Sequence, residues 1–273
     1  MMLRKVELEA SQRWSLVVSI VTYHSPQDEV LAAVASILGS TVRAHIILID
    51  NHSDAAYSKS LQAALPASVF YHRAPRNGGF GYGHNLALLM APPSDYLLIL
   101  NPDAILHQGA LESLLAFLEA RPEVGLVAPK VLYEDGQLQP LNKRHPNVLD
   151  LVLRRLPDSA LMRSSIVQRR LSHYQMLDMG YDTPYAVPFI SGCCMMFRRD
   201  ILQRLGGFDE RFFLYFEDAD LTRRVHCISQ AWYCPEAVIT HRWHRASKGN
   251  AAMFRILLQS AYYYFSKWGW AWW

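Results

Sequence analysis

Short apolar runs alternate with segments of helical periodicity over roughly the first seventy residues. The runs are residues 16–23, 45–49 and 69–71, and they are rich in β-branched side chains, as buried strands are. Between them, residues 28–38 have apolar side chains at helical spacing, and residues 55–65 are predicted to form a second helix. Strands and helices that alternate through short connections form a parallel sheet wound in the right-handed sense. We therefore predict an α/β fold with a Rossmann-like, mostly parallel central sheet flanked by helices.

A fourth apolar run ends abruptly in an acidic turn. Residues 96–100 are apolar throughout, as in a strand covered on both faces, and Asn101, Pro102 and Asp103 follow at once. Pro102 lacks an N–H donor and cannot continue a central strand, so the carboxylate of Asp103 is expected just past the strand's carboxyl end. Open α/β sheets bind ligands at that edge, and a carboxylate there is a candidate ligand for Mg²⁺ or Mn²⁺. The alternative is that Asp103 caps a helix starting near His107 or shapes a turn.

Two further segments are predicted to reach the same edge. Asp50 ends the second strand, where a carboxylate can bind a ribose hydroxyl or a base, although DNHSD is also a turn-forming sequence. Residues 77–85, NGGFGYGHN, hold four glycines in six residues, which allows the backbone to approach a phosphate or a sugar closely. A helix is expected through residues 86–90, with its N-terminus at the same place. The G-x-G-x-G spacing after a third strand argues against a dehydrogenase, whose G-x-G-x-x-G motif follows the first strand.

The α/β pattern is predicted to continue after an insertion. A helix is expected around residues 111–118 and a strand over 124–132. Residues 133–181 are more polar, carry basic clusters and show no clear strand, so we predict a variable insertion of helices and loops near the mouth of the site. Its basic residues either contact a phosphate-bearing acceptor or form a solvated face. Residues 187–197 are predicted to be one buried strand, and residues 198–205 a short helix ended by two glycines.

Two adjacent acids follow in an aromatic segment. Glu217 and Asp218 come after FDERFFLYF, whose last residue is Phe216. Acids in a first helical turn are favoured by the helix dipole, which would be a purely structural explanation. The functional explanation is a general base, because an apolar environment raises the pKa of a carboxyl group and orients it. We favour the second explanation, because a surface helix seldom has so many aromatic residues beside its first acids.

The chain ends in a histidine-containing strand and a tryptophan-rich tail. Residues 232–240 are predicted to be a strand with His241 at its end, where His241 is a candidate second metal ligand beside Asp103. Residues 251–273 are a candidate amphipathic helix, and they end in one lysine and four tryptophans. Such a tail suits peripheral contact with a membrane interface, and it suits packing on the domain or on another subunit about equally.

Composition excludes several classes of protein. The net charge of +3 is too small to indicate a nucleic-acid partner, and no stretch reaches the roughly 20 apolar residues of a membrane span. The four cysteines form no C-x-x-C pair, which indicates neither a zinc site nor a disulfide framework and favours a reducing, cytoplasmic setting. Residues 1–14 lack the apolar core of a signal peptide.

Taken in order, these motifs resemble those of family 2 inverting glycosyltransferases. They are SIVTYH, IDNHSD, NGGFGYGHN, LLILNPD, FISGCCMMFRRD and GGFDERFFLYFEDADLTRR, with a histidine before ASKG. Their order and spacing are typical of the rhamnosyltransferase-like branch of bacterial surface-polysaccharide assembly, over roughly residues 15–267. The resemblance implies a GT-A catalytic domain. The expected parts are an N-terminal extension (1–14), a catalytic domain (15–245) with a nucleotide-sugar half (15–132), an insertion (133–182) and an acceptor half (183–245), and a C-terminal aromatic helical tail (246–273).

The resemblance also implies roles for single residues. Asp218 would be the catalytic base, and Asp103 and His241 would bind Mg²⁺ or Mn²⁺ at the donor diphosphate. The nucleotide-sugar residues would be Thr22, Tyr23, Asp50, Asn77, Gly78, Gly79, Gly81, Asn85 and Asn101. The acceptor side would be formed by Glu217, Phe216 and Trp243. The metal motif of the family often has two or three acids, whereas Asn101 and Pro102 precede a single acid here, which predicts a modest metal affinity.

The implied activity is transfer of one sugar from a dTDP- or UDP-sugar, with dTDP-L-rhamnose as the best donor. The acceptor would be a hydroxyl of a growing surface glycan such as lipopolysaccharide O-antigen, carried on a lipid. The Q-x-x-R-W signature of processive synthases is absent, so one sugar is expected per acceptor. A nucleotidyltransferase is the second enzyme class, but a glycine- and basic-rich loop does not follow the first strand. A non-catalytic binding module would not need Asp103, Asp218 and His241 together.

Overall fold

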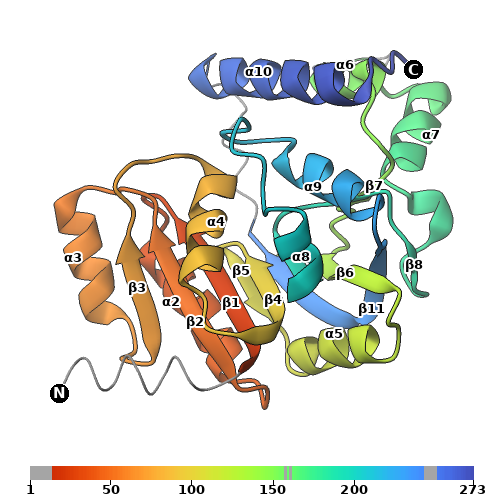
Figure 1. Ribbon diagram of the computed structural model, residues 1–273. Coiled ribbons are helices and arrows are strands. Elements are labelled where there is room, and N and C mark those ends of the chain that lie inside the picture. The colour runs from red at the N-terminus through yellow and green to blue at the C-terminus, as the bar shows by residue number, and fades with distance from the viewer. Residues whose placement is uncertain (1–13, 157–158, 160–161, 243–250) are drawn as a thin grey trace.

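The computed structural model describes residues 14–156, 159, 162–242 and 251–273. Within them, one nine-stranded mixed sheet forms the centre of the molecule, with helices on both faces (Figure 1). Its strand order is β3-β2-β1-β4-β10-β6-β11-β5, and β8 pairs with β11. β3, β2, β1 and β4 run parallel, as the alternation in the sequence predicts.

The parallel half is built from the predicted strand–helix units. Each buried strand ends in a polar turn, and the helices cover the strands because their apolar faces need a partner. These elements are β1 (Trp14–Thr22), α2 (Gln27–Leu38), β2 (Ala44–Asp50), α3 (Ala55–Ala64), β3 (Val69–Arg73), α4 (Phe80–Met90) and β4 (Ser94–Leu100).

The second half reverses the direction of the sheet. β10 is antiparallel to both β4 and β6, and β11 is parallel to β6 and antiparallel to β5. The elements here are β5 (Ala104–Leu106), α5 (Ala110–Glu119), β6 (Val124–Leu132), β10 (Cys194–Arg198), α8 (Arg199–Arg204), α9 (Glu217–Val225) and β11 (Gln230–His241). A change of strand order of this kind opens a crevice beyond the strand ends.

The predicted insertion contains short elements and one small sheet. β7 pairs with β9 in antiparallel register, so the expectation that this region carries no strand was wrong for two residues. The elements are β7 (Asn142–Lys143), α6 (Val148–Leu153), α7 (Ser165–Tyr174), the 3₁₀ turn η1 (Leu177–Met179), β8 (Tyr185–Ala186) and β9 (Phe189–Ile190).

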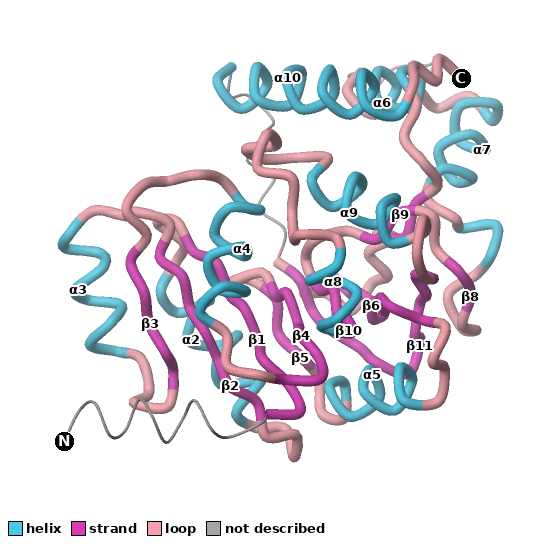
Figure 2. The backbone as a smooth tube through the Cα atoms, in the orientation of Figure 1, coloured by secondary structure: helices cyan, strands magenta, loops and turns pink. Residues whose placement is uncertain are grey.

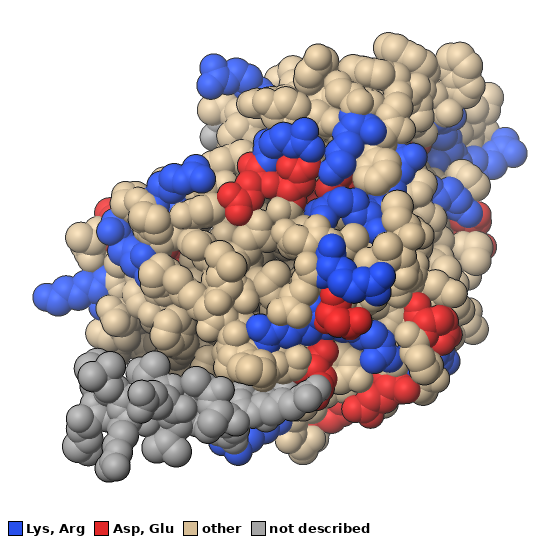
Figure 3. All heavy atoms as spheres, in the orientation of Figure 1, with Lys and Arg blue, Asp and Glu red and all other residues tan. Residues whose placement is uncertain are grey.

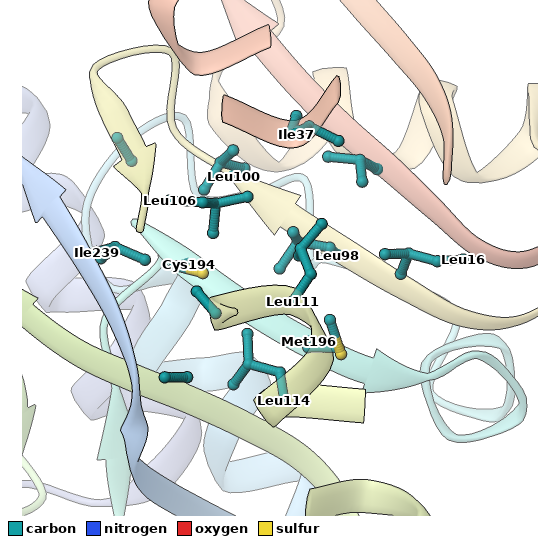
Figure 4. Close-up of a cluster of buried hydrophobic side chains, with 14 of the residues drawn as sticks. Leu16, Ile37, Leu98, Leu100, Leu106, Leu111, Leu114, Cys194, Met196 and Ile239 are labelled. Carbon is teal, nitrogen blue, oxygen red and sulfur yellow. The ribbon is translucent and has the colours of Figure 1, made fainter. Parts of the chain in front are cut away.

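Side chains of β4 alternate between two hydrophobic cores. Leu98 and Leu100 point to one face and pack with Ile37 of α2 and Leu111 of α5 (Figure 4). Leu97 and Ile99 belong to the opposite core, beneath α4 and α8. A strand with apolar residues at every position can only be buried on both faces. The two cores hold β4 rigidly, and with it the turn that carries Asp103.

The C-terminal helix α10 (Ala251–Trp268) lies across α9 (Figures 1 and 2). Tyr264 and Phe265 are almost fully buried in a third aromatic core with Phe212 and Phe216. The backbone carbonyls of residues 271 and 272 accept the N–H groups at the start of α6. The tail therefore packs on the rest of the chain.

Lys267 corrects one expectation about this tail. The sequence suggests a basic, tryptophan-rich patch, but Nζ of Lys267 lies 3.0 Å from Oδ2 of Asp209 and 2.8 Å from Oδ1 of Asp220. The indole N–H of Trp268 donates to the same oxygen of Asp220. These inward contacts anchor α10. In the described part of the chain, no helix has the length and apolar character needed to cross a membrane.

Three predicted boundaries were wrong. Residues 187–197 form two strands, because the turn at residues 191–193 sends β9 to the small sheet and β10 to the large one. α4 starts at Phe80, inside the glycine-rich segment, instead of near residue 86. β5 lies between Asp103 and α5, whose N-cap is Gly109, so Asp103 does not cap that helix.

Candidate active site

Asp103 and His241 meet where β5 pairs with β11. Asp103 follows β4 through Asn101, and His241 ends β11 opposite Ala104 of β5. Nε2 of His241 lies 3.4 Å from Oδ1 of Asp103 and 3.3 Å from Nδ2 of Asn101. Strand pairing thus brings the two predicted metal ligands together from distant parts of the chain.

The contacts of His241 decide which ring nitrogen faces Asp103 as an acceptor. Nδ1 of His241 donates to Oε1 of Gln139 at 2.9 Å, and no sequence motif singled out Gln139. A ring that carries a proton on Nδ1 has Nε2 as its acceptor, and Nε2 lies beside both the Asn101 amide and the Asp103 carboxylate. Two acceptors that face each other attract a cation.

This pair fits Mg²⁺ or Mn²⁺ held partly by the protein. The side chains of His241 and Asp103 are only 5% and 14% exposed, so solvent screens the carboxylate weakly. In the described ranges no group of three or more His, Cys, Asp or Glu side chains could hold a metal ion. A hard cation at Asp103 and His241 would take its other ligands from phosphate oxygens and water.

Asp218 lies in the first turn of α9, where backbone N–H groups hold its carboxylate. Oδ2 accepts the N–H of Gly192 and Oδ1 that of Ala219, both at 2.9 Å. Tyr215 and Phe216 form the preceding turn with φ values of 72° and 68°. Such angles are uncommon for bulky residues and persist where the surrounding structure enforces them, often at functional sites.

Glu217 and Asp218 are neighbours with different environments. Glu217 is buried, and its Oε2 has no hydrogen-bond partner among the residues that the structure describes. Burial, and then the charge of Asp218, raise the pKa of Glu217 well above its ordinary value. Burial also raises the pKa of Asp218, but the charge of Lys143 and the N–H groups of Gly192 and Ala219 oppose it. The net pKa shift of Asp218 is also upward, but that of Glu217 is larger, so Asp218 is the more acidic of the pair.

Cys193 links the two acidic sites. Its carbonyl oxygen accepts the N–H of Asn101 at 2.9 Å, and its neighbour Gly192 donates to Asp218. Burial, and then the charge of Asp103, raise the pKa of the Cys193 thiol to about 12, and the charges of Lys143 and Asp218 also act on it. Asp103 and Asp218 therefore belong to one site at the carboxyl edge of the sheet.

The glycine-rich segment is anchored by Asn51, which is part of the turn-forming DNHSD sequence and was not predicted to have this role. Nδ2 of Asn51 donates to Oδ1 of Asn77 and to the carbonyl of Gly79, both at 2.9 Å. Gly79 has a φ of 92°, and a Cβ there would lie 2.0 Å from the carbonyl oxygen of Phe213. A Cβ on Gly78 would meet the ring of Tyr82 at 2.4 Å. The glycines thus allow this segment to pack closely against α4 and the aromatic segment before α9.

Thr22, Tyr23 and Asp50 lie at the ends of β1 and β2. Tyr23 is about half exposed, whereas Thr22 is buried with Oγ1 3.0 Å from the hydroxyl of Tyr57. Burial raises the pKa of Asp50, but its hydrogen bonds outweigh this and lower it overall. The donors to Asp50 are the N–H of Ser53 and the hydroxyls of Ser58 and Tyr71, at 2.8, 2.5 and 2.7 Å. Contact of Thr22 and Asp50 with a nucleotide stays a prediction.

Comparison with known proteins establishes the family. The family model described as glycosyl transferase family 2 matches residues 17–206. The chain belongs to glycosyltransferase family 2. An N-acetylglucosaminyl-diphospho-decaprenol L-rhamnosyltransferase of Mycobacterium tuberculosis is 26% identical over 279 residues, covering 94% of this chain and 86% of the relative. Rhamnosyltransferase WbbL of Escherichia coli is 23% identical over 203 residues, covering 70% and 72%. Both of these relatives are named as rhamnosyltransferases.

Solved structures establish the fold of this glycosyltransferase. GalNAc-T7 with UDP, GalNAc and Mn²⁺ superposes with a TM-score of 0.65 at 17% identity over 92% of this chain, which spans about half (48%) of that protein. Mannosyltransferase PcManGT from Pyrobaculum calidifontis, in complex with GDP-Man and Mn²⁺, gives 0.61 at 18% identity, covering 94% and 65%. The predicted GT-A fold is confirmed.

Two predicted donor-site residues of the glycosyltransferase make packing contacts in the structure. The side chain of Asn85 accepts the N–H of Phe208 at 2.8 Å and donates to the carbonyl of Phe208 and to Glu210, both at 2.9 Å. Gly81 lies within α4, where a Cβ would meet Phe208 at 2.6 Å. Both residues join α4 to the loop before α9.

The predicted acceptor-side residues are also distributed differently. Phe216 is buried, and its ring centroid lies 5.3 Å from that of Tyr264 on α10, so it helps to anchor the tail. Glu217 is buried beside Asp218. Trp243 lies outside the described residues. Asp218, by contrast, is only partly buried.

Proposed function

We propose that this glycosyltransferase moves one L-rhamnose from dTDP-L-rhamnose to a hydroxyl of a lipid-linked glycan, with inversion at the anomeric carbon. The observation that carries the proposal is the carboxyl group of Asp218, which accepts the N–H of Gly192 in the same site as Asp103. A base on one side and a diphosphate-binding acid on the other suit a single displacement.

The chemistry follows from the roles of these side chains. Asp218 accepts the proton of the acceptor hydroxyl as the oxygen attacks the anomeric carbon opposite the leaving nucleoside diphosphate. The bond from the anomeric carbon to the diphosphate oxygen breaks as the new glycosidic bond forms, so no covalent enzyme intermediate is needed. Asp103 and His241 would hold a divalent cation, which neutralises charge on the leaving diphosphate.

Donor and acceptor are supported by relatives. Both curated relatives are rhamnosyltransferases, and the name of one describes a sugar carried by diphospho-decaprenol. We therefore expect a lipid-linked acceptor in the assembly of a bacterial surface glycan, with lipopolysaccharide O-antigen as one candidate product. We place the reaction at the cytoplasmic face of the inner membrane.

Membrane contact is proposed for the outer face of α10. Phe254, Leu258 and Tyr262 follow at four-residue intervals and are 43%, 53% and 59% exposed. Residues 251–273 contain no acid. Figure 3 shows the ridge along α10 as mostly uncharged, with basic side chains beside it. An aromatic surface with basic neighbours suits the headgroup region of an anionic membrane.

The test is a panel of nucleotide sugars with and without Mn²⁺, using lipid-linked and soluble acceptors. We expect nucleoside diphosphate release and an inverted product with dTDP-L-rhamnose. Pyrophosphate chemistry with a sugar phosphate would support the nucleotidyltransferase alternative, and ligand binding without any turnover would support a binding module. Protection against thermal unfolding by a GDP-sugar alone would contradict the assigned branch.

A further inference from the structure

A pocket of about 400 Å³ lies beside α9, outside the site described above. One wall is the insertion at His145, and the other is the tail at Trp268, Trp270 and Trp273, with Arg223 of α9 also lining the pocket. The tail reaches this place because Gly269, with a φ of 94°, turns the chain at the end of α10. The pocket therefore exists only because the tail folds back onto the insertion.

Arg223 supplies the positive charge in this pocket. Its guanidinium carbon lies 4.7 Å from the centroid of the Trp268 ring, and Nη1 is 3.4 Å from the hydroxyl of Tyr264. Across the described ranges, no carboxylate forms an ion pair with Arg223, because the nearby Asp220 pairs with Arg224 and Lys267. A guanidinium without an acid partner, stacked on an indole, is suited to a phosphate ligand.

The surroundings add positive charge. Desolvation and the charges of Arg223 and His226 lower the pKa of His145 to about 4. Desolvation, and then the charge of Arg154, lower the pKa of Lys143 to about 8. Desolvation is the larger cause of both shifts, and the neighbouring cations add to it. An anionic ligand would relieve that repulsion.

The pocket and Asp218 share helix α9. Arg223 follows Asp218 by five residues, which corresponds to about 7.5 Å along the helix axis and about 140° around it. The charge of Lys143 lowers the pKa of Asp218, and the charge of Arg223 lowers the pKa of His145. Residues 143–145 therefore run beside the part of α9 between Asp218 and Arg223. Two residues of extended chain span about 6.6 Å. The pocket and Asp218 therefore adjoin the same helix and the same segment of the insertion, as contact of one acceptor with both requires.

An apolar path leads away from the pocket. Leu149, Val152 and Leu156, on or just after α6, are 38%, 50% and 40% exposed. The N–H of Leu149 donates to the carbonyl of Trp272, so this row adjoins the tail that forms the pocket wall. An apolar chain attached to a phosphate in the pocket could lie along these side chains.

We infer that this pocket binds the diphosphate of a polyprenyl-diphosphate-linked acceptor, with Arg223 on the phosphate and the tail tryptophans on the first isoprenoid units. The inference rests on the proposed function, since it specifies how the acceptor is held. It assigns to the insertion and the tail a shared role in choosing lipid-linked acceptors.

Farnesyl diphosphate is the probe, titrated into the full chain with EDTA while tryptophan fluorescence is recorded. Asp103→Ala serves as the background, so that the donor site does not compete for diphosphate. We expect farnesyl diphosphate to bind at least about tenfold more tightly than farnesol or pyrophosphate. Arg223→Gln should weaken farnesyl diphosphate about tenfold or more, as expected for a charge-assisted hydrogen bond, and leave farnesol unchanged. Arg169→Gln, which removes an exposed arginine of α7, is the matched control and should change nothing.

A second variant keeps the pocket testable if Arg223→Gln fails to fold. Trp273→Ala alters an 86% exposed rim residue and should weaken farnesyl diphosphate and farnesol alike. Equal binding of farnesol and farnesyl diphosphate, or no effect of either variant, would overturn the inference. Because this assay needs neither donor nor transfer, tight probe binding without rhamnosyl transfer would refute only the proposed function. Transfer to a soluble acceptor without probe binding would refute only the pocket.

Discussion

Gly192 donates its backbone N–H to Oδ2 of Asp218 at 2.9 Å. The adjacent acid, Glu217, has a buried Oε2 with no partner. Two neighbouring carboxyl groups are thereby separated in function. Asp218 accepts two backbone N–H groups, which oppose the upward pKa shift caused by burial, whereas the pKa of Glu217 is raised further.

Asp218→Asn should keep nucleotide-sugar binding and lower turnover roughly 10²–10⁴-fold, the usual contribution of a general base. Glu217→Gln should cost much less, because Glu217 is buried and adjacent helical positions point about 100° apart. Steady-state turnover and donor affinity of both variants provide the measurement. If Glu217→Gln abolishes turnover while Asp218→Asn does not, the base has been assigned to the wrong acid.

Lys143→Met should move the acidic limb of the pH profile of kcat/KM to higher pH. The charge of Lys143 lowers the pKa of Asp218 against the effect of burial, so removing it raises that pKa and protonates the base at a higher pH. Lys143→Arg should return the acidic limb to the pH at which it lies in the parent enzyme. Arg144→Met is the control, because Arg144 pairs with Asp178 instead. If the acidic limb of the pH profile stays in place in Lys143→Met, Lys143 does not influence the pKa of the base.

Asp103→Ala should fold and lose the Mn²⁺-dependent thermal protection given by dTDP. Gln139→Leu should weaken Mn²⁺ about 10–100-fold, because Gln139 holds the metal-binding tautomer of His241. Saturating Mn²⁺ should rescue Gln139→Leu but not Asp103→Ala. Metal dependence that is identical in all three proteins would remove this pair from the mechanism.

Glu217 should make the free energy of unfolding fall as pH rises. Its ordinary pKa is 4.5 and its folded value is well above this, so between the two values the unfolded chain has released a proton that the folded chain retains. The stabilisation is complete below about pH 4.5 and is lost as pH rises through the raised value. Urea unfolding of Glu217→Gln should show a flatter pH dependence than the parent. The exposed Glu119→Gln should leave the slope unchanged, and an equal change in both variants would contradict this assignment.

Two changes in the tail should distinguish its role in folding from its role in membrane binding. Deletion of residues 251–273 should abolish soluble expression, since it uncovers the aromatic core around Phe212 and Phe216. Serine at Phe254, Leu258 and Tyr262 should preserve Tm, because these side chains face outward, and should reduce co-sedimentation with anionic vesicles. Full vesicle binding by the triple variant would remove the membrane role of α10.

Some features could be predicted from the sequence alone. The apolar run at residues 96–100 can be satisfied only between two layers, so β4 and the turn that places Asp103 at its end were predictable. The order of the motifs was enough to identify the family. The acids that follow the aromatic residues in LYFED were predicted to start a helix, and Asp218 does lie in the first turn of α9.

Other features depended on contacts between distant segments. Asp103 meets His241 only through the β5–β11 register, and Gln139 reaches the same histidine from the insertion. Residues 187–197 look like one strand because every residue is compatible with burial, but the turn before β10 divides them between two sheets. Local periodicity reports how a side chain is solvated, whereas partners across the fold are set by packing and hydrogen bonding, which no local pattern encodes. For the same reason the tail could be read as a membrane anchor or a packing helix from its sequence, and the burial of Tyr264 and Phe265 decided that it packs on the domain.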